Sequence, residues 1–451
     1  MGWFWGLGQR AAKPMPKKAT SDSRPELRLT VRFEEGDEGE FLIPACGGSC
    51  GGVPFRWNID WGDGARGCAS GVSSAWGGDV SSGDLVHSYA VPGTYEIALS
   101  PIEQVGETAG DAPGWLQAFG YPDGGLLRVG EMGLRPPQGV DKLIEVDGIL
   151  DDRAINIELE GACASMFTNC KNITMGPSFT ISSHKERAGD FFCFKMFAWD
   201  NGPTFAMGES FQLPRNLRTV GKAFCCKMFM CCNAPSFSMN DVFTIPQNIT
   251  SAGSSFCQEM FEEHGLGLTM GKAFNLPQGL VTVEDNFCAD MFLTSGGDGY
   301  RFEMNEIFNL PQHISGYVGN GFCSGMFSWN RGPNFSMNNK FNIPTGITSA
   351  GDEFCCKMFA GCSGARFSMN DIFNLPENFT WAGESCCAWM FKQCNGKRFK
   401  LNEKFDYPVG LTGSRLLAYE MFSECRWDAL NLNIQDIVSR NPHLQIWRQP
   451  I

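Results

Sequence analysis

Residues 347 to 379 read ITSAGDEFCCKMFAGCSGARFSMNDIFNLPENF, and the landmarks of this stretch return through most of the chain. The dipeptide Met-Phe recurs at intervals of 30 to 35 residues, at Met166, Met196, Met228, Met260, Met291, Met326, Met358, Met390 and Met421. A box of the form F-x-[LIY]-P keeps the same phase, ending at Pro214, Pro246, Pro277, Pro311, Pro344, Pro376 and Pro408. Self-similarity this regular predicts a solenoid of stacked coils, one for each repeat.

The pattern inside one repeat predicts the elements of a coil. Stretches such as RFSMN alternate as short strands do, and proline closes the F-x-[LIY]-P box where a ladder donor is not needed. In FCCKMFAGC (354–362), apolar residues fall at i, i+1, i+4, i+5 and i+8, which is typical of the buried face of a short helix. We therefore expect short strands, turns and one short helix in each coil, with aromatic and thioether side chains stacked between coils.

Most of the 20 cysteines occupy two fixed positions of the repeat. A second slot, four residues after the methionine of Met-Phe, holds cysteine in some repeats and Asp200, His264, Ser295 or Asn330 in others. The first slot, three residues before that methionine, becomes Ala418 in the last repeat, and a position that accepts Cys or Ala is a small buried apolar site. We predict a core ladder of eight thiols, Cys163, Cys193, Cys225, Cys257, Cys288, Cys323, Cys355 and Cys387.

Other roles for these cysteines are less well supported. Zinc sites use separated ligand pairs, whereas FCCKMFMCC (224–232) sets cysteines side by side, and the chain has only five histidines. A catalytic thiol needs a neighbouring base, and no histidine recurs beside a cysteine in the repeats. We expect no metal and no cofactor. Disulfides stay open, either locally in the repeats or among Cys46, Cys50 and Cys68; further candidates are Cys226, Cys231, Cys356 and Cys386.

Charge and hydropathy exclude some partners. The net charge is −13 and the isoelectric point is near 5.0, the opposite of a phosphate-binding surface, so we expect no nucleic-acid partner. The sequence shows no apolar run of the length that a transmembrane helix requires. Basic residues gather near the N-terminus behind MGWFWGLGQR, which predicts an arm at 1–26, either solvated or docked on a partner.

The repeats resemble a known family. NIPTGITSAGDEFCCKMFAGC (342–362) and NLPENFTWAGESCCAWMFKQC (374–394) are similar to BspA-like leucine-rich repeat surface proteins in the order Pro, Ile-Thr, Gly, Phe, Cys, over about 160–425. The chain departs from that family in its longer unit of about 32 residues and in using Met and Phe instead of Leu and Ile. The resemblance implies a β-rich, leucine-rich-repeat-like solenoid that acts in adhesion or ligand binding at cell surfaces.

A second resemblance lies upstream. WNIDWGDG (57–64) and HSYAVPGTYEIAL (87–99) are similar to the two best-known motifs of the PKD domain, a β-sandwich that serves as a spacer or binding module in extracellular proteins. Physically, Gly62 and Gly64 allow a tight turn around Asp63. The alternation of Tyr95, Ile97 and Leu99 then predicts a strand with one buried face.

These observations divide the chain into five segments. We predict an arm at 1–26, a PKD-like β-sandwich at 27–102, and a linker with a degenerate capping coil at 103–159, where GLRPPQGV echoes FNLPQGLV. About nine repeats form the solenoid at 160–425. The tail at 426–451 has helical spacing at Leu430, Ile434 and Ile437 and is expected to cap the last coil.

The sequence favours binding over catalysis. It contains no P-loop and no H-E-x-x-H motif, so we expect no enzyme and no catalytic residues. The positions after each Met-Phe vary between repeats and mix aromatic, amide and charged side chains, which either merely connect elements or stack on sugars and anchor protein partners. The candidate ligand-binding edge carries Trp199, Asp200, Asn201, His264, Tyr300, Trp329, Asn330 and Arg331.

Two functions therefore compete. The first is a non-enzymatic adhesion protein, extracellular or on a cell surface, that recognises a glycan or protein ligand through its solenoid. The alternative is a structural part of a virion or other particle, such as a phage tail or capsid appendage with a role in host-receptor binding. In that case the arm at 1–26 contacts the particle or a second copy of the chain. The sequence shows no export route.

Overall fold

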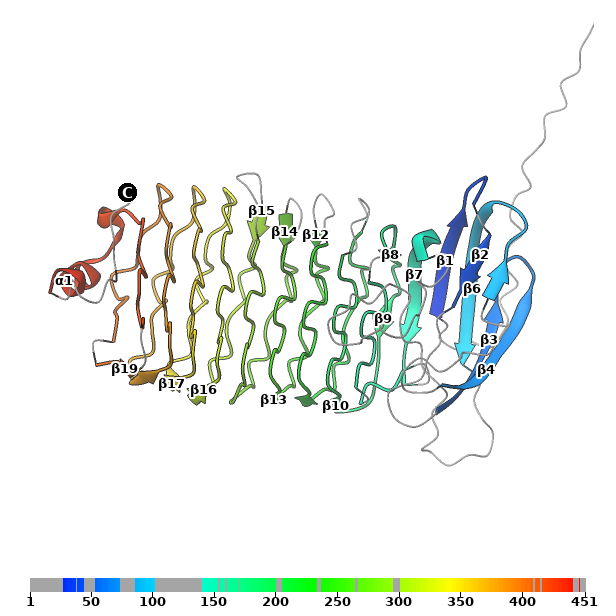
Figure 1. Ribbon diagram of the computed structural model, residues 1–451, viewed down its shortest axis with the longest axis horizontal. Coiled ribbons are helices and arrows are strands. Elements are labelled where there is room, and N and C mark those ends of the chain that lie inside the picture. The colour runs from blue at the N-terminus through cyan, green and yellow to red at the C-terminus, as the bar shows by residue number, and fades with distance from the viewer. Residues whose placement is uncertain are drawn as a thin grey trace, which may run out of the picture.

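The computed structural model shows an elongated protein, with a β-sheet domain at one end and a long stack of coils behind it (Figure 1). It describes residues 27–37, 39–43, 53–73, 86–101, 140–152, 155–158, 160–168, 170–199, 205–232, 237–263, 267–294, 301–408, 410–413, 416–440 and 446. The predicted arm, most of the predicted linker, Cys46 and Cys50 lie outside these residues.

The N-terminal part is built from antiparallel strands. Its strands are β1 (Leu27–Phe33), β2 (Glu40–Leu42), β3 (Val53–Asp60), β4 (Arg66–Ser73), β5 (Val86–Ser88) and β6 (Gly93–Pro101). One sheet has the order β4-β3-β6-β1, and β2 pairs separately with β5. Strict alternation buries every second side chain of β1, as a half-buried strand requires. The tight turn predicted around Asp63 is present, with a positive φ at Gly62 and Gly64.

A single strand joins this part to the solenoid. After the short 3-10 helix η2 (Val140–Lys142), strand β7 (Leu143–Leu150) pairs antiparallel with β1 on one side. On its other side it pairs in parallel with β8 (Thr174–Met175) and β9 (Thr180–Ile181), which belong to the first coils. The sheet is therefore continuous across the junction, and the first coil has no open edge there.

The rest of the chain is a β-solenoid with little helix. Short strands of successive coils pair in parallel along opposite long edges (Figure 1). One edge carries β10 (Arg187–Ala188), β11 (Thr219–Val220), β13 (Ser251–Ala252), β16 (Ser315–Val318), β17 (Gly346–Ala350), β18 (Trp381–Ala382) and β19 (Thr412–Gly413). The other carries β12 (Phe237–Ser238), β14 (Gly267–Thr269) and β15 (Arg301–Glu303).

The helix predicted in each coil is absent, and overlapping turns take its place. Around Met358, amides at every second residue donate three residues back, as from Met358 to the Cys355 carbonyl at 3.3 Å. The alternate amides donate to the next coil, as from Phe359 to the Met390 carbonyl at 2.8 Å. The φ angle is positive at Cys355 and Lys357, the third residues of their turns, which is the type II pattern. We call this segment, present in every coil, the turn ribbon.

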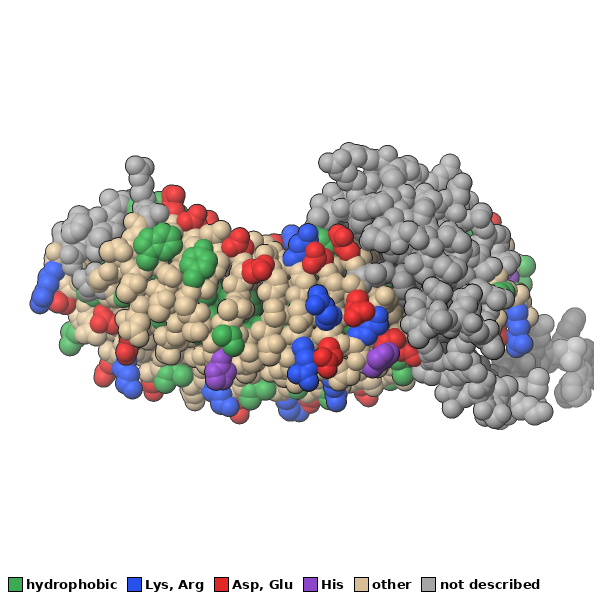
Figure 2. All heavy atoms as spheres, turned by 90° about the horizontal axis from the view of Figure 1, so that it is seen from below, with side chains coloured by type: hydrophobic (Ala, Val, Ile, Leu, Met, Phe, Trp, Pro, Cys, Tyr) green, Lys and Arg blue, Asp and Glu red, His purple; other side chains and the backbone are tan. Residues whose placement is uncertain are grey.

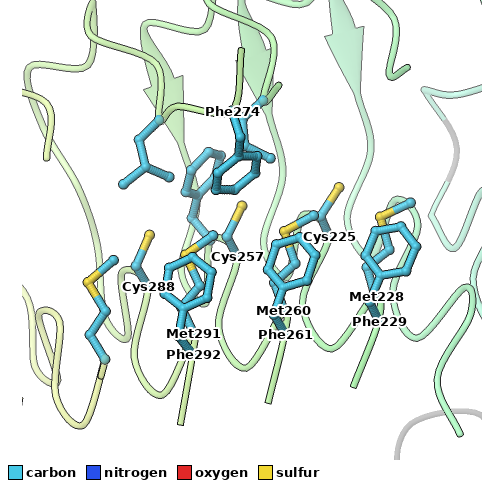
Figure 3. Close-up of a cluster of buried hydrophobic side chains, with 14 of the residues drawn as sticks. Cys225, Met228, Phe229, Cys257, Met260, Phe261, Phe274, Cys288, Met291 and Phe292 are labelled. Atoms are coloured by element: carbon cyan, nitrogen blue, oxygen red, sulfur yellow. The ribbon is translucent and has the colours of Figure 1, made fainter. Parts of the chain in front are cut away.

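The core is a set of parallel columns of side chains. The phenylalanines of Met-Phe stack coil on coil with rings nearly parallel, for example Phe327 on Phe359 at a centroid distance of 5.6 Å and 3°. The phenylalanines of the F-x-[LIY]-P boxes form a second column, and its rings meet the first column edge to face, as at Phe341. Figure 3 shows the cysteine, methionine and phenylalanine of three successive turn ribbons in equivalent positions. The buried sulfur and aromatic groups thus repeat along the solenoid.

The tail covers the last coil. A 3-10 turn, η3 (Trp427–Ala429), precedes helix α1 (Leu432–Arg440), which buries Ile434 and Ile437. Asn431 caps the helix, because its Oδ1 accepts from the Ile434 amide at 2.9 Å. Leu430, the third residue of the predicted helical face, is buried just before α1. The amide of Phe422 in the last turn ribbon donates to the Ile446 carbonyl of the tail.

Candidate functional site

A ladder of asparagines fixes several coils against the preceding one, whereas the repeats at Met175, Met207 and Met270 carry glycine at this position. In the sequence it is the asparagine of M-N-x-x-F and L-N-x-x-F, and in the tail that of L-N-x-x-I. At Asn370, the side-chain amide donates to the carbonyls of Asn338 and Phe341 in the preceding coil at 2.6 and 2.9 Å. Its Oδ1 accepts from two amides of its own coil, those of Ile372 and Phe373. The equivalent residues are Asn240, Asn305, Asn338, Asn402 and Asn431.

The eight cysteines predicted as a core ladder are all buried, at most 1% exposed. They are free thiols, like the other cysteines of the described residues. Burial raises the pKa of several of these thiols well above the usual value, because an apolar surrounding disfavours the thiolate; this holds for Cys193, Cys257, Cys288, Cys323 and Cys355. Thiols of this kind are inert as nucleophiles and metal ligands.

The second cysteine slot has a specific partner. The thiol of Cys362 donates to the Phe327 carbonyl of the preceding coil at 3.0 Å. In the next two coils, the thiols of Cys394 and Cys425 donate in the same way to the carbonyls of Phe359 and Phe391. In the coil where asparagine replaces cysteine, the Asn330 side chain donates to the Phe292 carbonyl at 2.8 Å. In each of these coils the side chain, cysteine or asparagine, donates to a carbonyl of the preceding coil, so both residue types meet the same need there.

We predict that the ladder thiols do not react in the folded protein. Treatment with iodoacetamide near pH 8, followed by peptide mass spectrometry, is expected to label exposed Cys68 and to leave Cys288 and its seven equivalents unlabelled. The same reaction in denaturant serves as the control, because every thiol is then accessible. Labelling of Cys288 as fast as Cys68 in the native protein would contradict a packed core ladder.

The predicted ligand-binding edge is only partly within the described residues. Asp200, Asn201, His264 and Tyr300 lie outside them. Trp329 is 38% exposed, its ring rests on the backbone of Gly361, and the Arg331 guanidinium lies 4.7 Å from the ring centroid. Trp199 is half-buried, four repeats away, with Lys195 over its ring. The structure thus describes separate aromatic and cationic pairs here and does not bring Trp199 and Trp329 together.

Asn330 requires a correction. Its place after Met-Phe predicts the exposed edge, but its side chain is fully buried and donates to carbonyls of Phe292 and Phe327. It holds neighbouring coils together and contacts no solvent. The physical reason is the position of the second slot, which points into the stack and not towards the loop that follows it.

A different surface brings aromatic side chains into one line. From Cys193 onward, the residue six positions before the first slot, which is Ala418 in the last repeat, faces outward on the parallel strands, and we call this set the outer row. Cα pairing joins Arg187, Thr219, Ser251 and Thr282 in one series, and Tyr317, Ser349, Trp381 and Thr412 in another. Two of its members are large and exposed, Tyr317 at 57% and Trp381 at 45%.

A β-bulge sets the orientation of Tyr317. The register between β16 and β17 shifts between Gly316 and Tyr317, and Gly316 has a φ of 78°. Glycine adopts this left-handed conformation without a steric penalty, and such bulges commonly redirect a side chain. The following residue, Val318, is fully buried, so the strand remains attached to the core directly beside the exposed ring.

The strand positions beside the two rings are uncharged, and the exposed acidic residues Asp352 and Glu384 stand three residues beyond the row positions of their coils. The strand positions just before Ser349, Trp381 and Thr412 hold Thr348, Thr380 and Leu411. The charged member of the outer row, Arg187, belongs to the first coils, where Arg218 pairs with Glu186 at 3.2 Å. Figure 2 shows one long face of the solenoid, on which broad uncharged areas separate the charged side chains.

Among the residues that the structure describes, no group of three His, Cys, Asp or Glu side chains could hold a metal ion. Within the same residues, the helices lack the combination of length and hydropathy needed for a membrane span.

Comparison with known proteins adds little. No family model matches the chain, and no curated protein does. Among solved structures, a leucine-rich repeat protein from Bacteroides ovatus is similar at 11% identity, with 68% of this chain and 95% of that chain covered and a TM-score of 0.14. A likeness at this TM-score carries no argument, so the fold and the site rest on the geometry of the chain itself.

Proposed function

We propose that the protein is a non-enzymatic binding protein of the cell surface, which recognises a glycan or protein ligand through the outer row of its solenoid. The observation that carries the proposal is the pair Tyr317 and Trp381, both strongly exposed on one face of a parallel sheet whose other face is packed in the core. Aromatic side chains held on a rigid surface are the residues that most often dominate binding energy.

The architecture supports this proposal. A solenoid repeats one unit along an axis and so offers an extended surface on which single positions vary without disturbing the core. In the outer row the residue changes from Thr or Ser to Arg, Tyr or Trp, while from Ala188 to Ala382 the residue that follows is buried, small and apolar. The resemblances to BspA-like repeats and to a PKD domain agree with the proposal, because both families are implied in extracellular binding or spacing.

An array of glycans and cell-surface proteins, probed with the full chain, tests the proposal. Wild-type protein is expected to bind at least one class of probe, and the double variant Tyr317→Ala with Trp381→Ala is expected to lose that signal. The matched control is Trp329→Ala, which removes an exposed ring from the other candidate edge. If neither variant lost the signal, the proposal would be overturned. If only Trp329→Ala lost it, the proposal would also be overturned and the site would lie on the edge that carries Trp329.

A further inference from the structure

We infer that the outer row binds an uncharged, extended β-1,4-linked glycan chain that lies along the solenoid axis. This inference rests on the proposed function, because it names the ligand class for the same surface.

The spacing of the rings matches a repeating ligand. Tyr317 pairs with Ser349, and Ser349 pairs with Trp381, so the rings stand two strands apart. With neighbouring strands about 4.8 Å apart, that separation is about 9.6 Å along the axis. In an extended β-1,4-linked chain, successive sugars face opposite ways and every second sugar presents the same face. Two rings one disaccharide apart can therefore stack on equivalent faces of one chain.

The groups around the rings suit a sugar. The negative face of an aromatic ring attracts the weakly positive C–H groups on the face of a pyranose. The hydroxyls of Thr348 and Ser349 lie on β17, between the rings, and hydroxyls both donate to and accept from sugar hydroxyls. The Thr380 hydroxyl, just before β18, donates to the Thr348 carbonyl at 3.3 Å and keeps its oxygen as an acceptor. The Thr412 hydroxyl donates to the Thr380 carbonyl at 2.9 Å, which leaves its oxygen free to accept.

Charge favours a neutral chain and limits its position. No charged residue occupies the outward positions at and beside the two rings. These positions are Ser315 to Tyr317, Thr348, Ser349, Thr380 and Trp381. An acidic polysaccharide or a phosphate-bearing ligand is recognised by Arg and Lys side chains, which this half of the surface lacks. Arg187 and the Arg218–Glu186 pair occupy the first coils, so the inferred chain lies over β16 to β19.

Isothermal titration of the full chain tests the inference. The probes are cellohexaose and chitohexaose, which are extended and uncharged, their disaccharides, and maltohexaose, whose α-1,4 linkage curves the chain. At least one β-1,4 hexasaccharide is expected to bind, with an affinity at least tenfold higher than that of its disaccharide. The reason is that a disaccharide can stack fully on only one of the two rings at a time. Tyr317→Ala and Trp381→Ala are each expected to weaken it by about tenfold.

The outcomes separate this inference from the proposed function. Absence of binding by both β-1,4 hexasaccharides, or equal binding of maltohexaose, overturns the inference. If the array then shows a protein probe that depends on Tyr317 and Trp381, the proposed function stands and only the ligand class is wrong. If no array signal depends on these rings, both fail. The thermal unfolding of each variant, expected to match wild type, shows that lost binding is not lost folding.

Discussion

Replacement of Phe327 by alanine is expected to lower the free energy of unfolding by about 3–5 kcal/mol, the range for a large aromatic removed from a packed core. Phe327 is fully buried at the crossing of two columns. Its ring stacks on Phe292 and Phe359 at 5.5 and 5.6 Å and meets Phe341 edge to face at 5.4 Å. The solenoid cannot close around the gap, because the hydrogen bonds between coils fix their separation.

Denaturant unfolding followed by circular dichroism measures this effect. Phe327→Leu keeps part of the volume but loses the stacked rings, so an intermediate loss is expected. Ile372→Ala is the control, because that side chain is 46% exposed and its loss should change stability by no more than about 0.5 kcal/mol. If Phe327→Ala unfolded at the same denaturant concentration as Ile372→Ala, the column would not support the stack.

Asn370→Ala is expected to cost about 3 kcal/mol, because a buried polar group left without a partner costs about 1–3 kcal/mol. The Asn370 side chain is 7% exposed and serves two carbonyls of the preceding coil and two amides of its own. Alanine leaves all four groups without that partner in a place with little access to water.

Asn370→Asp and Asn339→Ala sharpen the same measurement. Aspartate keeps the acceptor for the two amides but loses both amide donors and, when ionised, faces two carbonyls. Burial raises the pKa of such a carboxyl, so the variant should lose stability as the pH rises above the ordinary carboxyl pKa and recover part of it in acid. Asn339 is exposed beside the ladder, and its replacement should be nearly neutral. Equal losses at Asn339 and Asn370 would contradict the ladder.

The solenoid follows from the sequence because the repeat is explicit. The phenylalanines of Met-Phe and of the F-x-[LIY]-P box stack on the equivalent phenylalanines of the neighbouring coils. Equivalent side chains meet in this way only if successive coils lie in register. The asparagine ladder was also within reach, because M-N-x-x-F keeps the same phase. Its role is visible only when the carbonyls of the preceding coil are in place, which a single repeat does not show.

The turn ribbon was not predictable from periodicity. Its inward pairs at i, i+1, i+4 and i+5 have the spacing of a short helix, so the pattern fits both structures. What separates them is the positive φ at residues such as Cys355 and Lys357, which non-glycine residues seldom adopt. The hydrogen bonds from each coil to the next compensate for that cost, and no local sequence signal reports them.

The outer row was not predictable from single repeats for a related reason. Its members are mostly Thr and Ser, which read as ordinary strand residues, and Tyr317 and Trp381 occur 64 positions apart in the chain. Alignment of each repeat on its first-slot cysteine places both six residues upstream of it, and that alignment is the signal that could have found them. The varied loops after Met-Phe drew attention instead, because their aromatic residues are close together in sequence.

The central claim is that coil stacking sets the distance between the two exposed rings and that this distance selects the ligand. The double variant Ser349→Trp with Trp381→Ser tests it most directly, because it keeps two aromatic rings in the outer row but places them on adjacent strands. Its affinity for the β-1,4 hexasaccharide that wild type binds is measured by titration, with thermal unfolding as the check on folding. The account predicts wild-type unfolding and an affinity no better than that of Trp381→Ala; wild-type affinity in this variant would contradict it.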